Sequence, residues 1–128
     1  MKSGAAALCI PFCVLLAACH QQGVDSHAPR YTRVAGANPE RGARLLEQYQ
    51  CGSCHLIPEV PSATDGMGPT LASYGRRSYI AGHIPNTPDT LVAWLQQPSA
   101  LLPGTLMPDS GVSQADARDM AAYLMSLQ

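Results

Sequence analysis

The motif Cys51-Gly52-Ser53-Cys54-His55 lies near the middle of this 128-residue chain. Two cysteines separated by two residues and followed directly by histidine form the attachment signature of a c-type haem. At this spacing both thiols lie on one helical turn, where they can add across the two vinyl groups of a haem. The histidine then sits under the iron, so the motif predicts a covalent haem with His55 as an axial ligand.

A Cys-x-x-Cys pair has two other common uses. It can form the dithiol redox centre of a thioredoxin-like domain, which requires a βαβ context, and no such alternation of patterns is present here. It can also supply half of a zinc site, which requires a second pair of ligands, and no cysteine follows Cys54. The sequence therefore favours haem over both alternatives.

The length fits a single small domain. A domain of this size buries only about two-thirds of the surface that its unfolded chain exposes, so it needs an additional source of stability. A covalently attached and largely apolar haem would form the centre of the core and meet that need.

The remaining three cysteines lie near the N-terminus. Cys9 and Cys13 fall within an apolar run behind Lys2, and this arrangement predicts a secretory signal peptide over residues 1–18 that is removed. The apolar run is too short to predict a transmembrane span. The protein is therefore expected to leave the cytoplasm.

Cys19 ends the sequence Leu16-Ala17-Ala18-Cys19, which resembles the lipobox of bacterial lipoproteins. That resemblance implies lipidation of Cys19 as the first mature residue, whereas a plain signal cleavage near Ala18 would leave its thiol free. An unpaired thiol is a liability in an oxidising compartment, so we favour lipidation. The expected location is the bacterial cell envelope, with the domain in the periplasm or on the outer face of the cytoplasmic membrane.

The charge of the chain restricts its partners. Lys2 is the only lysine, and residues 19–128 carry seven arginines against nine acidic residues. A basic patch with interleaved aromatic residues is lacking, so nucleic acid is not an expected partner. A ring of lysines that would steer the domain to an acidic partner is also absent.

Residues 19–37 are polar and small, and they predict a flexible tether ahead of a domain over residues 38–128. The first helix is expected to begin at Asn38, an N-cap followed by proline, and to lead into the haem motif. Its apolar positions recur at helical spacing, and they are Gly42, Leu45, Leu46 and Tyr49.

Two further helices are predicted. One is capped by Thr87 and stopped by Pro98, and the last begins where Ser113 and Asp116 stand at capping-box spacing. Residues 73–82 fit either a short helix or an extended segment.

The opposite face of the iron has several candidate ligands, namely Met67, Met107, Met120, Met125 and His83, or it stays open. Met120 and Met125 lie on a regular helix, where core packing is the default. Met67 follows His55 too closely to reach the other face easily. Met107 lies in a proline-braced loop able to present its thioether, and Met/His ligation raises the reduction potential. The residues alone favour Met107 as the sixth ligand and keep His83 as an alternative.

Residues 38–128 resemble a class I cytochrome c. The haem motif is followed by Gly68-Pro69-Thr70-Leu71, then by the Trp94–Pro98 segment Trp-Leu-Gln-Gln-Pro, and then by the Pro103–Met107 segment Pro-Gly-Thr-Leu-Met. The resemblance implies an all-α fold of three to five helices around one covalently bound haem c, in which the N- and C-terminal helices cross, with Tyr123 on the last helix and a glycine, Gly42, at the crossing. It also implies Met107 as the sixth ligand and the Pro69 carbonyl as the partner of His55.

The middle of the chain is similar to cytochrome c domains associated with bacterial haem–copper oxidases. This similarity implies that Arg76 or Arg77 meets a haem propionate, with Tyr79 and Asn86 nearby. Two further haem contacts are expected: Trp94 packs against the macrocycle in a place where a tyrosine is common, and Thr105 donates to the ligand sulfur.

The resemblance implies a membrane-tethered, monomeric carrier of single electrons in a bacterial respiratory chain, and not an enzyme. The expected acceptor is a terminal cytochrome oxidase, with a quinol-oxidising complex or a dehydrogenase as donor. Two alternatives remain open: a cytochrome subunit of a periplasmic dehydrogenase or reductase, and a haem sensor with a displaceable sixth ligand.

Overall fold

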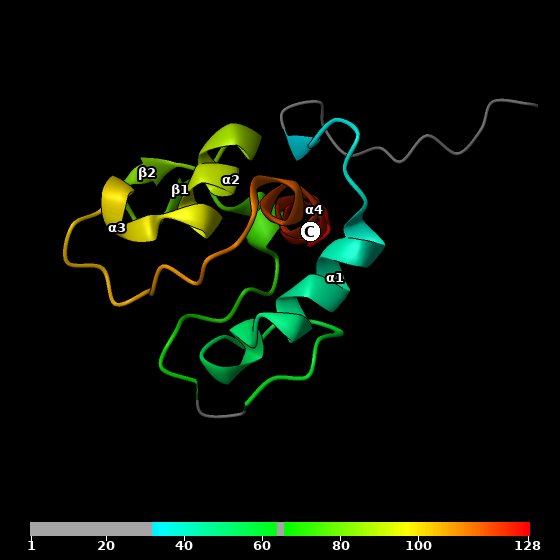
Figure 1. Ribbon diagram of the computed structural model, residues 1–128, viewed down its shortest axis with the longest axis horizontal. Coiled ribbons are helices and arrows are strands. Elements are labelled where there is room, and N and C mark those ends of the chain that lie inside the picture. The colour runs from blue at the N-terminus through cyan, green and yellow to red at the C-terminus, as the bar shows by residue number, and fades with distance from the viewer. Residues whose placement is uncertain (1–31, 64–65) are drawn as a thin grey trace, which may run out of the picture.

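A computed structural model describes residues 32–63 and 66–128, which fold around four α-helices (Figure 1). The short elements are two 3₁₀ helices and one antiparallel hairpin that pairs Tyr79 with Pro85. The mainly helical architecture confirms the predicted fold class. In chain order the elements are α1 (Pro39–Gln48), η2 (Cys51–Ser53), η3 (Tyr74–Arg76), β1 (Tyr79–Ile80), β2 (Ile84–Pro85), α2 (Pro88–Gln96), α3 (Pro98–Leu101) and α4 (Gln114–Ser126).

The three longer helices begin at the predicted caps. The Asn38 side chain accepts a hydrogen bond from the Arg41 N–H at 2.8 Å, and the Thr87 hydroxyl accepts one from the Thr90 N–H at 3.3 Å. The Ser113 hydroxyl accepts from the Asp116 N–H at 3.1 Å. Each cap satisfies a backbone donor that the first turn of a helix leaves without a partner.

A break in the helix separates α1 from the haem motif. It ends at Gln48, and Gln50 adopts a left-handed conformation with φ 58° before η2 begins. A left-handed residue just past a helix is a common terminator. The new direction lets the Cys51 carbonyl accept from the N–H groups of Cys54 and His55, at 3.2 and 3.0 Å, which closes a tight turn around the motif.

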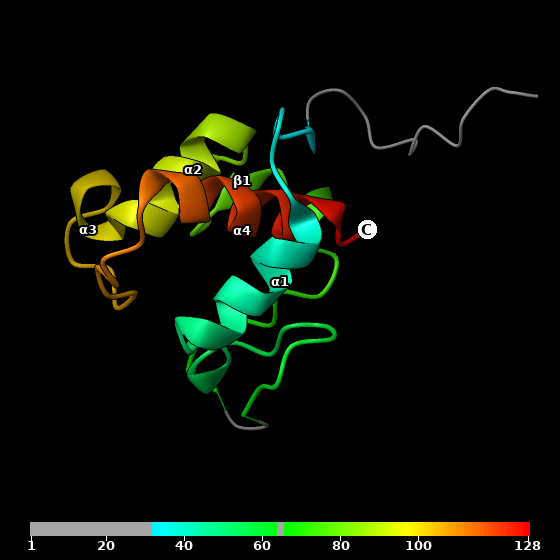
Figure 2. The ribbon, with the colours of Figure 1, turned by 45° about the vertical axis from the view of Figure 1, so that its right-hand side comes forward.

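Helices α1 and α4 cross in direct contact (Figures 1 and 2). They meet at Gly42, where a side chain would collide with the backbone of Asp119 and Met120. The predicted crossing at a glycine is thereby confirmed. Met120 and Met125 are 0% and 1% exposed, so they are core residues, as predicted from their helical spacing.

Residues 73–82 contain both of the structures that their sequence allowed. Tyr74–Arg76 forms a 3₁₀ turn, and Tyr79–Ile80 is a short strand. Gly75 fits closely beneath the Met125 carbonyl, and its N–H donates to the Leu127 carbonyl at 2.8 Å. This segment is therefore anchored to the end of α4.

Residues 32–37, which the sequence pattern assigns to the tether, pack against the domain. Thr32 and Val34 are buried, and the Arg118 guanidinium donates to the Ala35 carbonyl at 2.5 Å. The packed part of the chain therefore begins no later than Thr32, because a contact from distant α4 holds a segment that has no apolar period of its own.

The predicted signal peptide and the predicted lipidation at Cys19 lie outside the described residues. Within residues 32–63 and 66–128, none of the helices has the length and apolar character needed to cross a membrane.

Candidate functional site

One cavity of about 530 Å³ collects the motif residues from distant parts of the chain. Its lining includes Cys51, Cys54 and His55 from the turn after α1, and Met107 from the loop after α3. Aliphatic side chains from α1, β1, α2, α4 and the loop before η3 form much of the remaining wall, and they are Leu46, Leu71, Ile80, Leu91, Leu95 and Leu124. The cavity therefore offers an apolar space bordered by two thiols, an imidazole and a thioether.

These donors fit a haem. The apolar walls suit the macrocycle, and the two cysteines provide thiols for thioether bonds. Burial raises the pKa of the Cys51 thiol. A zinc site would need more ligands, and the described ranges hold no group of three or more His, Cys, Asp or Glu side chains placed to bind a metal ion.

The imidazole of His55 has a fixed orientation. Its Nδ1 lies 2.8 Å from the Pro69 carbonyl oxygen, which is the contact that the family resemblance implies. Because a carbonyl oxygen only accepts, Nδ1 carries the proton and Nε2 presents its lone pair. Nε2 is thus the nitrogen available to iron, and the bond to Pro69 fixes the orientation of the ring.

The segment that carries Pro69 is tied to the haem motif by backbone hydrogen bonds. The Gly68 N–H donates to the Cys54 carbonyl at 2.8 Å, and the Leu71 N–H donates to the Leu56 carbonyl at 2.7 Å. A side chain on Gly68 would collide with the His55 ring. The glycine therefore allows the carbonyl of the next residue to approach the imidazole.

Met107 is the methionine best placed to face His55. It is partly buried against the core and lines the cavity, and its N–H donates to the Thr105 hydroxyl oxygen at 3.3 Å. Because that oxygen accepts from the backbone, the Thr105 hydroxyl proton can be directed elsewhere, including toward a ligand sulfur. Met67 also lies at the cavity but is 92% exposed.

His83 occupies a different place. It is exposed in the turn between β1 and β2, where its N–H donates to the Ile80 carbonyl at 3.1 Å. The cavity lining does not include it. The geometry therefore favours Met107 over His83 for the sixth position.

The two candidate arginines differ in position. Arg77 lines the haem cavity, donates to the Thr70 carbonyl, and has its guanidinium carbon 5.3 Å from the centre of the Tyr74 ring. Arg76 is exposed and borders a separate polar cavity of about 430 Å³, which Arg77 also borders. Arg77 is therefore the arginine directed toward the haem site.

Asn86 does not line the haem cavity but contacts the backbone of Arg77, which does. Its side-chain nitrogen donates to the Arg77 carbonyl at 3.0 Å, which supports the backbone that carries the arginine. Trp94 and Tyr79 do line the cavity, the former buried and the latter 56% exposed.

Sequence reasoning missed Tyr74 as a wall of the site. This tyrosine is buried, lines the cavity, and burial raises its pKa to about 12, although nearby Arg77 acts in the opposite direction. Its position before the Arg76-Arg77 pair was the only available signal. The segment gave no periodicity that would have placed the ring inside.

The cavity mouth has an apolar rim. Leu106 is 96% exposed, and Met67 and Tyr79 are also exposed, yet all three side chains line the cavity. We call these three residues the apolar rim. An exposed apolar group of this kind at a binding site suits contact with another molecule.

The fold and the site define a protein that binds a c-type haem covalently. A model of the Cytochrome c family matches residues 39–128, and the chain belongs to that family. It therefore carries one covalently bound haem c and acts as an electron carrier, which are the general properties of this family.

Relatives include parts of larger proteins. The chain is 33% identical over 89 residues to "Cytochrome c oxidase subunit 2" of Alkalihalophilus pseudofirmus, covering 69% of this chain and 25% of that protein. It is 26% identical over 105 residues to the protein of the same name in Bacillus subtilis, covering 80% of this chain and 30% of that protein. The chain thus spans less than a third of these relatives.

A curated protein and a solved structure match over nearly their whole length. "Cytochrome c" of Gibberella zeae is 31% identical over 104 residues, covering 71% of this chain and 95% of that protein. The structure of cytochrome c2 from Rhodobacter sphaeroides superposes with a TM-score of 0.54 and 21% identity, covering 71% of this chain and 96% of that chain. This superposition supports the class I cytochrome c fold.

Proposed function

We propose that this protein is a membrane-tethered monohaem cytochrome whose iron is held between His55 and Met107 and which delivers single electrons to a terminal cytochrome oxidase. The observation that carries the proposal is the shared cavity, in which the two thiols, the oriented imidazole and the thioether of Met107 border one apolar space.

A bound haem supplies reversible one-electron chemistry at its iron, with a potential set by the axial ligands and their surroundings. His55 provides a basic nitrogen, which Pro69 orients, and the Met107 thioether raises the potential. The buried leucines and Trp94 exclude water from the cavity walls. If His55 and Met107 both bound the iron, the protein would leave no position there for a substrate, as a carrier requires.

Arg77 is assigned to a haem propionate. Its planar guanidinium suits a carboxylate, and its contacts with the Thr70 carbonyl and the Tyr74 ring hold it at the cavity. Asn86 supports it from behind through the Arg77 carbonyl. Arg76 points to the second cavity and is not required for this role.

Two observations support an oxidase as the acceptor. The Alkalihalophilus and Bacillus relatives carry the name of an oxidase subunit, and the apolar rim surrounds the cavity mouth. The chain has a single lysine, Lys2, so docking relies on apolar contact. A lipid anchor at Cys19 would add to this weak docking, because tethering to the same membrane raises the effective concentration of the two partners.

The test uses the matured holoprotein. Redox titration with spectra should show one c-type haem with a near-infrared sulfur–iron band, and the ferrous form should refuse carbon monoxide at neutral pH. Met107→Ala should remove the band, lower the potential and admit carbon monoxide. His83→Ala is the matched control and should change none of these. Ready binding of carbon monoxide by the unaltered protein would instead support a sensor.

The acceptor and the anchor need separate tests. Membranes that contain the oxidase should oxidise the reduced protein, and Cys19→Ser should release the protein from the membrane fraction without altering its spectrum. Co-purification with a large catalytic subunit of a dehydrogenase, without oxidation by the oxidase, would support the alternative role.

A further inference from the structure

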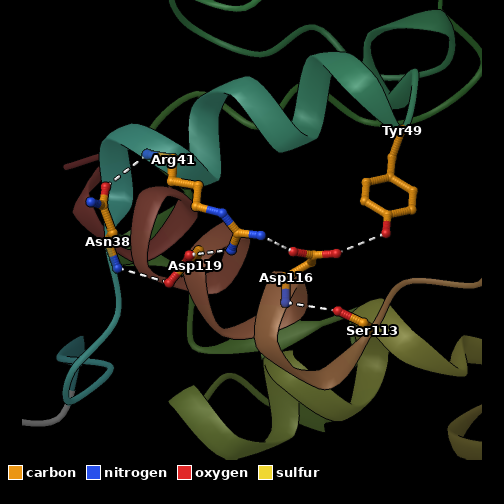
Figure 3. Close-up of polar contacts among 6 residues, drawn as sticks. All are labelled: Asn38, Arg41, Tyr49, Ser113, Asp116 and Asp119. Atoms are coloured by element: carbon orange, nitrogen blue, oxygen red, sulfur yellow. Dashed lines mark hydrogen bonds and ion pairs between the residues drawn. The ribbon is translucent and has the colours of Figure 1, made fainter.

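A polar cluster joins α1 to α4 (Figure 3). Arg41 on α1 donates to two carboxylates of α4, to Asp119 at 2.6 Å and to Asp116. At the other end of α1, the Tyr49 hydroxyl donates to the second oxygen of Asp116 at 2.9 Å. The Asn38 N–H donates to Asp119 at 2.8 Å. Asp116 thus accepts from both ends of α1.

Tyr49 belongs to two environments. Tyr49 lines the haem cavity, and its hydroxyl donates to Asp116, which is not one of the residues that line the cavity. The bond to Asp116 raises the pKa of Tyr49, and burial acts in the same direction. Because Tyr49 comes just before Cys51, the position of its ring is linked to the turn that carries the thiols and His55.

Asp116 belongs to the other helix of the crossing pair, α4. It lies in the first turn of α4, directly after the loop over residues 102–113 that carries Met107. Its side chain is only 16% exposed, so water competes weakly for the carboxylate. The hydrogen bond from Tyr49 therefore connects the segment with His55 to the segment with Met107 at the point where each meets a helix.

We propose that Asp116 is a positioning residue that, through Tyr49, holds the His55 and Met107 sides of the haem cavity together and so keeps external ligands from displacing the thioether. The inference rests on the proposed axial role of Met107. Arg41 has the supporting task of fixing one carboxylate oxygen, which leaves the other directed at Tyr49. Loss of the bond would free the tyrosine ring and loosen the wall between the two segments.

The chain provides a matched control. Asp119 also binds Arg41 and joins α1 to α4, and its side chain is 13% exposed, close to the value for Asp116, but it makes no contact with Tyr49. Asp116→Asn and Asp119→Asn should therefore both lower the overall stability. Only the first should alter the haem site.

The test measures the binding of imidazole to the ferric holoprotein, together with the sulfur–iron band and unfolding in guanidinium. Asp116→Asn and Tyr49→Phe should each raise the imidazole affinity about three- to tenfold, since the first removes the charge of the acceptor and the second removes the donor of this hydrogen bond. Tyr49→Phe keeps the ring and removes only the hydroxyl, so it preserves the packing. The double variant should match the single variants, because both remove the same interaction.

The outcomes separate the two proposals. If the unaltered protein lacks the sulfur–iron band, the proposed ligation fails. If the band is present but Asp116→Asn and Tyr49→Phe leave imidazole affinity unchanged, or if Asp119→Asn raises it equally, the positioning role of Asp116 is overturned while the ligation stands.

Discussion

Gly42 of α1 lies against the carbonyl oxygen of Asp119 in α4, with no room for a side chain between them. The two helices therefore touch through their backbones, which brings the first turn of α1 to the middle of α4. This contact fixes the angle at which α1 carries the chain to Cys51.

Gly42→Ala should destabilise the protein although alanine is the better helix former. The added methyl group meets backbone atoms that cannot rotate away, so the helices must separate, at a cost of about 1–3 kcal/mol typical of overpacking. The gain in helix propensity is about 1 kcal/mol at most. Guanidinium unfolding of the holoprotein measures the difference, with the exposed Arg44→Ala of the same helix as control. Equal or greater stability of Gly42→Ala would contradict the close contact.

Gly68→Ala should disturb the iron ligand more directly. Its methyl group would collide with the His55 ring and displace the Pro69 carbonyl from Nδ1. We expect a lower stability, by about 1–3 kcal/mol, together with an altered haem spectrum and potential. Pro69→Ala is the control, because it keeps the carbonyl oxygen and should leave the potential nearly unchanged. An unaltered spectrum in Gly68→Ala would show that the histidine does not depend on this neighbour.

The ion pairs of Arg41 with Asp116 and Asp119 should make the free energy of unfolding depend on pH in the acid range. Ser113, Tyr49 and Arg41 stabilise the carboxylate of Asp116 and lower its pKa from the usual 3.8. Burial works to raise the pKa of Asp119, but the Asn38 N–H and Arg41 outweigh it, so that this pKa is also lowered. Because both folded-state values lie below the unfolded ones, the stabilisation is complete above about pH 4 and is lost as the pH falls through the lowered values.

Measurements of the free energy of unfolding at a series of acid pH values check the direction of this dependence. The stability difference between the unaltered protein and Asp116→Asn should be largest near neutral pH and should shrink below the usual carboxyl range. The groups facing Asp116 are Arg41 and Tyr49 from α1 and Asp119 and Ser113 from its own region, and neither Arg41 nor Tyr49 changes charge at acid pH. A difference that grew on acidification would refute the assignment.

Local signals in the sequence were sufficient for the helix starts but not for the contacts between distant segments. Asn38, Thr87 and Ser113 act within their own first turns, so their spacing alone predicts the caps. Asp116 also has a predicted place at capping-box spacing, yet its carboxylate is directed to Arg41 and Tyr49, 75 and 67 residues away along the chain.

In the haem site, too, the residues with a local motif were predictable and the contacts between distant segments were not. Cys51, Cys54, His55 and Met107 are identifiable because haem attachment and the family motifs require these residue types. The inward position of Tyr74 and the separation of Arg76 from Arg77 depend on how the η3 turn packs on α4, and no periodicity in residues 73–82 reports that packing. The contact of Ala35 with the domain likewise depends on Arg118, far along the chain.

The apolar rim gives a prediction for electron transfer. Leu106→Asn should slow the oxidation of the reduced protein by an oxidase about five- to tenfold, as expected for the loss of a central apolar contact. Because Leu106 is 96% exposed, the substitution should leave stability and potential unchanged.

Leu56→Asn is the matched control, since Leu56 is 52% exposed but does not line the cavity mouth. Stopped-flow oxidation at several ionic strengths measures both effects. The chain's single lysine implies a rate that changes little with salt, whereas a steep fall with ionic strength would show that charged contacts, rather than the apolar rim, direct docking.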